Sequence, residues 1–370
     1  MRRETGSRLG LLAGALIAVA SCRPTTIVDR QIASGPQAVG CAPPNCGDPR
    51  DVVSVTYLGI SGILIEHDGH ILLTAPFFSN PPFAARGRNT FRWLATGPRL
   101  TPDSLVIERL LPRSADRASV ILVGHGHYDH LMDVPYIATH RTKSAAIFGG
   151  PSIRHMLMGD SALRSNADRL AVIPVGRAGN VTRDGDWYYS GDSAFRFMAL
   201  IAGHAPNYLI GRWGFLYAEG AVQSDMDSLP HTAAEWKLGE PYSFLIDVLS
   251  PTRRTVFRIY FQDAPSQAPL GFPSDLLAAS RRIDLAILCA ATSSNVSAAP
   301  DSLLRVLKPA AVVVTHWESF FRSRLLPPAL SHATDLRALS HSLRRSLPPG
   351  TGWIVPIPLQ TVRFSAADHT

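Results

Sequence analysis

The chain has 370 residues, of which 46% are hydrophobic and 18% are charged, and its formal net charge is +7. This composition excludes a disordered chain and fits one large globular domain or two ordinary ones. The positive charge comes almost entirely from arginines that are scattered along the sequence. Because a nucleic-acid-binding face needs a basic patch or stripe, we expect no nucleic-acid partner.

The N-terminal segment has the pattern of a targeting signal. Three arginines precede an apolar run, residues 9–20, that is too short for an ordinary membrane-spanning helix. The run leads to Cys22 and resembles a bacterial lipoprotein signal, in which cleavage precedes a cysteine that is then lipidated. An ordinary secretory peptide with an incidental cysteine is the alternative. We therefore expect a signal peptide over 1–21 and a lipid anchor at Cys22, through which the protein contacts a membrane.

The resemblance implies a place in the bacterial cell envelope, facing the periplasm or the cell surface. Arg23 follows the cysteine, and the absence of aspartate there favours the outer membrane. Residues 22–50 are rich in proline, glycine and polar residues and are interpreted as a tether, so the folded domain spans 51–370. Cys41 and Cys46 could pair in an exported protein, which the sequence leaves open.

From residue 52 onward the pattern favours strands. Apolar or alternating runs predict strands at 54–59, 63–67, 70–74, 119–123, 145–148, 170–175, 186–189, 195–201, 243–249, 255–261, 285–289 and 310–314, and a final hairpin of 353–357 with 360–364. Asp68-Gly69 is a hairpin turn signal between two of these runs. Cys289 lies in an apolar run and is predicted to be a buried free thiol.

Helices are predicted between several of these strands. A helix over 101–111 would be capped by Thr101, with proline in its first position. Further helices are expected from just past His130 to His140, over 151–158 and over 333–347. The stretch 207–240 is longer than a minimal core needs, and it is interpreted either as a lid or as a tolerated surface insertion.

Potential metal ligands are concentrated directly after the strand predicted at 119–123. They are His125, His127, Asp129 and His130. Imidazole and carboxylate groups are the donors that zinc and similar ions take. Residues two apart on an extended segment point to the same side, so His125 and His127 can hold one ion, and the next pair is placed for a second. A solvated histidine-rich turn is the alternative interpretation.

Three more potential ligands also follow apolar strands. His204 comes after the strand at 195–201, Asp263 after 255–261, and His316 after 310–314. Ligands at strand ends gather at one edge of a sheet, where the strands hold them in place. Four aromatic residues are candidates for lining a pocket beside them, although aromatic side chains more often belong to the core: Phe77, Phe78, Trp93 and Trp317.

With these motifs, the chain from about Val52 to Phe364 resembles the metallo-β-lactamase superfamily of binuclear hydrolases. The motif at 125–130 matches the family pattern His-x-His-x-Asp-His, and the stretches 203–206, 260–263 and 314–317 match its later motifs in order. The resemblance implies an α/β fold, the four-layer αββα sandwich. It also implies two divalent metal ions, for which we expect zinc, with manganese or iron as alternatives.

The resemblance also assigns roles to the candidate residues. It implies that one ion is held by His125, His127 and His204, the other by Asp129, His130 and His316, with Asp263 bridging them. A hydroxide between the ions would be the nucleophile, and Asp129 would be the catalytic residue that orients it and passes a proton to the leaving group. We expect an ester, lactone or phosphodiester substrate, either a small molecule or a lipid, outside the cytoplasm.

Two departures from the family pattern favour another class of function. Ala75 stands where aspartate is usual before Pro76, and Gln262 stands where glycine is common. They are the sequence support for a catalytically impaired surface lipoprotein that acts as a binding module. The seven candidate ligands are complete, which favours the enzyme. The sequence leaves the oligomeric state, the physiological metal and the substrate open.

Overall fold

The computed structural model describes residues 35, 39–41, 46, 48–81, 100–206 and 218–366 of the chain. The predicted signal peptide, the anchor at Cys22, most of the tether and Trp93 lie outside these residues. Among the described helices, none is both long and apolar enough to cross a membrane. The proposed membrane anchor therefore stays a prediction.

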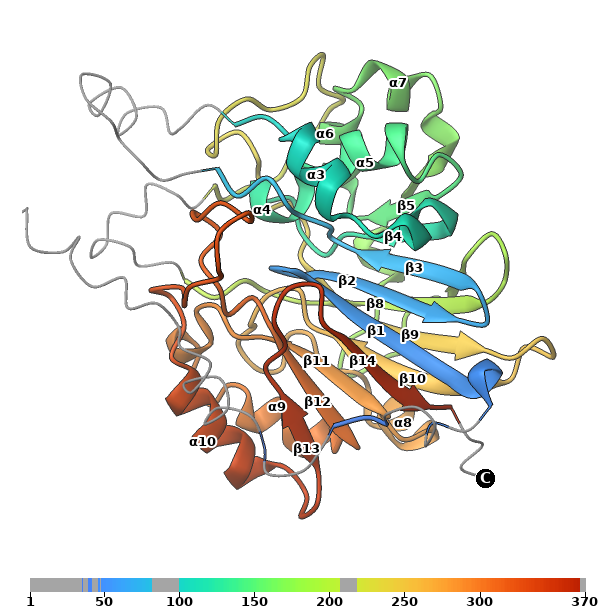
Figure 1. The fold of residues 1–370 in the computed structure, drawn as a ribbon, viewed down its shortest axis with the longest axis vertical. Helices are drawn as coiled ribbons and strands as arrows, with labels where there is room; N and C mark the ends of the chain where they lie inside the picture. The colour runs from blue at the N-terminus through green and yellow to red at the C-terminus, as the bar shows by residue number, and fades with distance from the viewer. Residues whose placement is uncertain are drawn as a thin grey trace, which may run out of the picture.

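Two mixed sheets, each of seven strands within the described residues, form the centre of the fold (Figure 1). The first sheet runs in the order β14 (Thr361–Ser365), β1 (Val52–Gly59), β2 (Gly62–His67), β3 (His70–Thr74), β4 (Ala118–Leu122), β5 (Ala146–Gly149) and β6 (Leu170–Val172). The second runs in the order β13 (Gly352–Ile354), β12 (Ala311–Thr315), β11 (Leu285–Cys289), β10 (Thr255–Phe261), β9 (Tyr242–Leu249), β8 (Phe195–Ile201) and β7 (Tyr188–Tyr189). Neighbours from β3 to β6 and from β10 to β13 are parallel, and the other neighbouring strands are antiparallel.

Helices cover the outer face of each sheet (Figure 1). Over the first sheet lie α3 (Ser104–Leu110), α4 (Tyr128–Leu131), α5 (Val134–His140), α6 (Pro151–Leu157) and α7 (Ser161–Arg164). Over the second lie α8 (Asp275–Ser280), α9 (Asp301–Leu307) and α10 (Leu336–Ser346). Short 3-10 helices are η1 (Pro49–Asp51), η3 (Arg113–Arg117), η4 (Ala167–Arg169), η5 (Val175–Arg177) and η6 (Ser293–Asn295). The predicted four-layer αββα sandwich is confirmed.

Side chains of the central strands alternate between two cores, because successive residues of a strand point to opposite faces. In β2, Ile63 and Ile65 pack in the core between the sheets, whereas Leu64 packs in the core under the helices. In β4, Leu122 packs in the core between the sheets and Ile121 in the core under the helices. Strands that are buried on both faces have nearly continuous apolar sequences. The bounds of these strands could therefore be predicted accurately from the sequence.

Local turn and cap chemistry explains two boundaries. The predicted hairpin turn is confirmed, since Asp68 and Gly69 both have positive φ, 47° and 80°, between paired strands β2 and β3. The helix predicted over 101–111 begins later, at Ser104. Its N-cap is Asp103, whose side chain accepts a hydrogen bond from the Val106 N–H, so the prediction of Thr101 as the cap was wrong.

The final predicted hairpin was also wrong, because its two strands lie in different sheets. β13 pairs in parallel with β12, and β14 pairs antiparallel with β1. The connection between them contains Pro356 and Pro358, which have no N–H to donate to a strand ladder. The helix expected from just past His130 to His140 is α5, which begins at Val134, after the separate short helix α4. At the break, the Asp133 carboxylate accepts hydrogen bonds from the N–H groups of Phe78 and Ser79.

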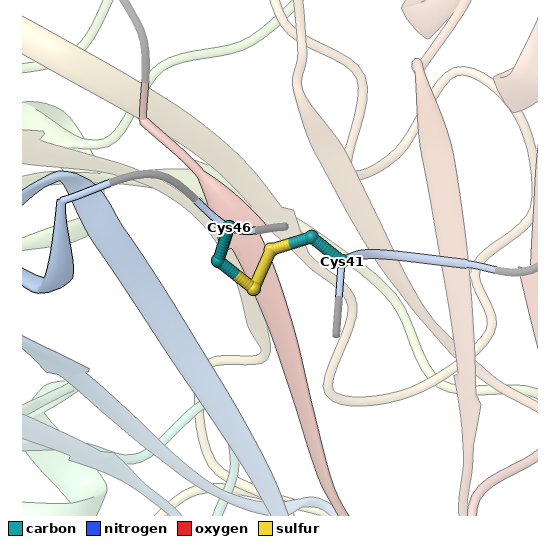
Figure 2. The surroundings of a disulfide bond; sticks show 2 residues. All are labelled: Cys41 and Cys46. Carbon is teal, nitrogen blue, oxygen red and sulfur yellow. A yellow bond between two sulfur atoms is a disulfide. The ribbon is translucent and has the colours of Figure 1, made fainter. Parts of the chain in front are cut away.

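Cys41 and Cys46 form a disulfide beside β14 (Figure 2). The Cys41 N–H donates to the Arg363 carbonyl oxygen at 2.7 Å. This hydrogen bond joins the disulfide loop to β14, the edge strand of the first sheet. Cys289 is a buried free thiol, as predicted. The disulfide closes a loop with a sequence separation of only 5 residues.

Loss of this disulfide should destabilise the protein modestly. Closing so short a loop removes little entropy from the unfolded chain, and the loop-entropy relation gives roughly 2 kcal/mol. We expect a Cys41→Ser/Cys46→Ser variant to unfold with a free energy lower by about that amount, measured by urea titration. Adding a reductant should weaken the wild-type protein equally and leave the variant unchanged. Equal unfolding midpoints for variant and wild type would contradict the prediction.

Candidate metal centre

The predicted ligands come from the ends of four strands. His125 and His127 lie in the loop after β4, and Asp129 and His130 lie in α4, which begins directly after that loop. His204, Asp263 and His316 follow β8, β10 and β12. The expectation of a single sheet edge was incomplete, because β4 belongs to the first sheet and the other three strands to the second. The residues meet where the edges of both sheets come together.

The structure brings the seven predicted ligands into one cluster, which consists of two triads and Asp263. We call His125, His127 and His204 the first triad, because their donor atoms lie within 4.8 Å of one another. Asp129, His130 and His316 meet the same criterion and form the second triad. The His204 ring centroid lies 5.0 Å from that of His125, and the His316 centroid lies 5.4 Å from that of His130. The grouping in space agrees with the one that the family resemblance implied, and the roles as ligands remain proposals.

Asp263 connects the two triads. Its Oδ2 lies 2.8 Å from His125 Nδ1, and its Oδ1 lies 2.9 Å from His130 Nδ1. One carboxylate oxygen therefore faces each triad, which is the position that a bridging ligand requires. The backbone of this residue is fixed as well, because the Ser61 hydroxyl donates to the Asp263 carbonyl oxygen at 3.2 Å. Ser61 was interpreted from the sequence as part of a turn, and it lies between β1 and β2.

The cluster contains buried polar atoms that lack a protein partner. His125 is fully buried, and its Nε2 has no hydrogen-bond partner. His316 is 4% exposed, and its Nδ1 has none either. Leaving a buried polar nitrogen unsatisfied costs about 1–3 kcal/mol, so such atoms call for a ligand. His204 Nδ1 lies 2.7 Å from the Ala205 carbonyl oxygen, which suits donation from Nδ1 and leaves the lone pair on Nε2. The donor set therefore fits divalent cations.

Burial keeps imidazoles of the first triad neutral. Burial lowers the pKa of His125, and the charge of His130 adds to this effect. Burial and the charges of His125 and His204 hold the pKa of His127 well below its usual value. Burial and the charge of His125 lower the pKa of His204 to about 3. Neutral imidazoles are the form that binds a metal ion.

The neighbouring histidines keep the two aspartates ionised, although burial acts against this. Burial raises the pKa of Asp129, but the neighbouring His130 and His316 outweigh it, and the net shift is downward. Burial likewise raises the pKa of Asp263, and His130 and His125 more than reverse that effect. Two buried, ionised carboxylates at the centre of the cluster favour the binding of cations.

Close packing around the motif involves residues that the sequence did not single out. A Cβ atom on Gly124 would lie 2.4 Å from the Asp263 Cβ and Oδ2 atoms, so only glycine fits directly before His125. The Gly126 N–H donates to the Leu238 carbonyl oxygen at 2.9 Å. Residues 218–240 of the predicted lid or insertion are thus packed beside the motif, with Trp236 1% exposed, and residues 207–217 lie outside the described part of the chain.

Aromatic side chains lie beside the second triad. Phe77, Phe78 and Trp317 are fully buried, and the Trp317 indole N–H donates to the Pro356 carbonyl oxygen. The sequence did not point to Phe320, a half-buried residue whose ring centroid lies 5.5 Å from that of His316. It also contacts Tyr128 edge to face, at 6.1 Å.

No protein-family model and no curated protein matches this sequence. Among solved structures, the chain is similar to the metallo hydrolase Igni18 of Ignicoccus hospitalis, at 15% identity over 85% of this chain and 98% of that one, with a TM-score of 0.43. It is similar to the metallo-β-lactamase fold protein YhfI of Bacillus subtilis, at 12% identity over 85% and 100%, with a TM-score of 0.44. It is also similar to the diiron β-hydroxylase CmlA of Streptomyces venezuelae, at 14% identity over 86% and 55%, with a TM-score of 0.45. Likenesses at these values assign neither a substrate nor a metal to this chain.

Proposed function

We propose that this protein is a binuclear metal-dependent hydrolase. The observation that carries the proposal is the pair of buried triads joined by Asp263, with one carboxylate oxygen facing each triad. The donors are imidazoles and carboxylates only, which suits zinc, with manganese and iron as alternatives. Of the cysteines that the structure describes, none takes part, since Cys41 and Cys46 pair with each other and Cys289 bonds a backbone carbonyl.

Each part of the cluster has a distinct task in this proposal. The first triad would hold one ion and the second triad the other, and Asp263 would keep them at a fixed separation. When bound, the two ions would polarise the bond under attack and lower the pKa of water to about 7. Asp129, whose Oδ2 lies 3.3 Å from His316 Nε2, would orient the attacking water and carry its proton to the leaving group.

The proposed substrates are esters, lactones and phosphodiesters, in small molecules or lipids, outside the cytoplasm. The Cys41–Cys46 disulfide supports an exported location, because such bonds persist in oxidising compartments. A lipid anchor at Cys22 in the cell envelope would place the site near a membrane. The complete set of ligands argues against the alternative of an impaired binding module.

The test combines elemental analysis with a substrate screen. Purified protein should contain two equivalents of divalent metal per chain and should hydrolyse at least one ester, lactone or phosphodiester. Metal-free protein is the control for each substrate, and activity should return when zinc or manganese is added. One equivalent of metal or none, with no turnover on any substrate class, would overturn the proposal.

A further inference from the structure

Next to the second triad lies a network of buried side chains, none of which is a proposed metal ligand. We call Tyr57, Glu318 and Arg324 the back network. The Tyr57 hydroxyl donates to one oxygen of the Glu318 carboxylate. The other oxygen accepts from the Ile60 N–H at 3.0 Å and from Arg324 Nη1 at 3.2 Å. Arg324 also donates to the Leu58 carbonyl oxygen, so the network joins β1 and the turn after it to the segment that follows β12.

The back network ends on the backbone of His316. The His316 N–H is shared between the Tyr57 hydroxyl oxygen, at 3.0 Å, and the Ile60 carbonyl oxygen, at 2.9 Å. His316 has a φ of +53°, in the left-handed region that non-glycine residues rarely adopt. Such a conformation persists only where the surroundings hold it, and these two acceptors are the contacts that do so.

The ring of His316 differs from that of His204 in how it is oriented. Metal-binding histidines are usually fixed by a hydrogen bond from the second ring nitrogen. His204 has the Ala205 carbonyl oxygen in that role. The Nδ1 of His316 is buried and has no partner. Its Nε2 lies 3.3 Å from Asp129 Oδ2, which is itself a proposed ligand. Neither ring nitrogen therefore has a hydrogen-bond partner outside the cluster, and the support of His316 from outside the cluster comes through its backbone.

We propose that the back network is a positioning device for His316 and thereby sets the affinity of the second metal position without affecting the first. Tyr57 is the residue that couples the network to His316. The inference rests on the proposed binuclear site. The first triad has an independent support, because the Ser266 hydroxyl bonds both the N–H and the carbonyl oxygen of Gly203, each at 3.0 Å, directly before His204.

Two properties of the network suit this task. Tyr57 and Glu318 are each 1% exposed, so water cannot replace a lost contact. The Tyr57 hydroxyl has both of its hydrogen-bonding roles filled, because its proton goes to the Glu318 carboxylate. The hydroxyl then accepts the His316 N–H with its lone pairs.

The test is a Tyr57→Phe variant, which removes the hydroxyl and preserves the ring. Stepwise binding of zinc or cobalt to metal-free protein is measured by competition with a chromophoric chelator. The first dissociation constant should stay within about twofold of wild type, and the second should rise roughly 10- to 100-fold. A Glu318→Gln variant, which keeps the shape of the side chain, should shift the second constant in the same direction.

The matched control is Tyr242→Phe. Tyr242 is also 1% exposed, and its hydroxyl donates to the Ile173 carbonyl oxygen at 2.9 Å. This variant loses a comparable buried hydrogen bond and should keep both dissociation constants. If Tyr57→Phe leaves the second constant unchanged, or weakens both positions equally, the inference is overturned while the binuclear site stands. Wild-type protein that binds fewer than two ions would overturn the proposed function, and this inference with it.

Discussion

Replacing Asp263 by alanine is expected to weaken both metal positions together, whereas His204→Ala and His316→Ala should each empty one. Asp263 is the residue that faces both triads, through Oδ2 toward His125 and Oδ1 toward His130. His204 belongs to the first triad only, and His316 belongs to the second only. Without the carboxylate, two buried imidazoles also lose the partner that orients them.

The expected effects are large enough to separate by experiment. Loss of both ions removes several kcal/mol of transition-state stabilisation, so turnover by Asp263→Ala should fall by about 1,000-fold or more. Metal content should fall from two equivalents toward none, against about one for each histidine variant. Asp301→Ala is the control, because Asp301 is a buried aspartate that pairs with Arg345 and Ser346, away from the cluster. An Asp263→Ala protein that retains two tightly bound ions would rule out the bridging role.

The sequence predicted the parts of the fold that depend on local patterns. The bounds of β8, β10 and β11 agree with the predicted runs, because strands buried on both faces are short apolar stretches. The order of ligands after strands was also visible, since the three later ligands each lie within three residues of the end of such a run. The closing strands β13 and β14 were misassigned because the choice of partner strand is a tertiary property. Neighbours along the chain are expected to pair, and these two do not.

The residues that support the site could not be predicted from the sequence, for a related reason. Tyr57 and Glu318 lie 261 positions apart, so no window of sequence contains both. Each looks ordinary alone: tyrosine in a strand is a common core residue, and glutamate two positions after His316 suggests a solvated turn. The left-handed backbone of His316 could not be predicted from the amino-acid composition of this segment either. Only the arrangement of both sheets shows that these residues converge.

Gly124 is the position where the smallest change should have a large effect. A methyl group there would lie 2.4 Å from the Asp263 side chain, closer than real contacts allow. Asp263 cannot move freely, because Ser61 holds its carbonyl oxygen and His125 and His130 hold its carboxylate. A Gly124→Ala variant must therefore displace either His125 or the bridging group.

The expected outcome for Gly124→Ala is weaker binding of both ions and turnover lower by about 100-fold, the cost of a misplacement of roughly 1 Å at a reacting centre. Gly191→Ala is the matched control, because a methyl group at Gly191 meets nothing within 4 Å. Metal content, chelator competition and turnover are compared for the two variants. If Gly124→Ala binds both ions as tightly as wild type, Asp263 can shift without loss and is not a fixed bridge. If only one position weakens, the methyl group acts through His125 alone, which separates the role of the loop after β4 from that of the carboxylate.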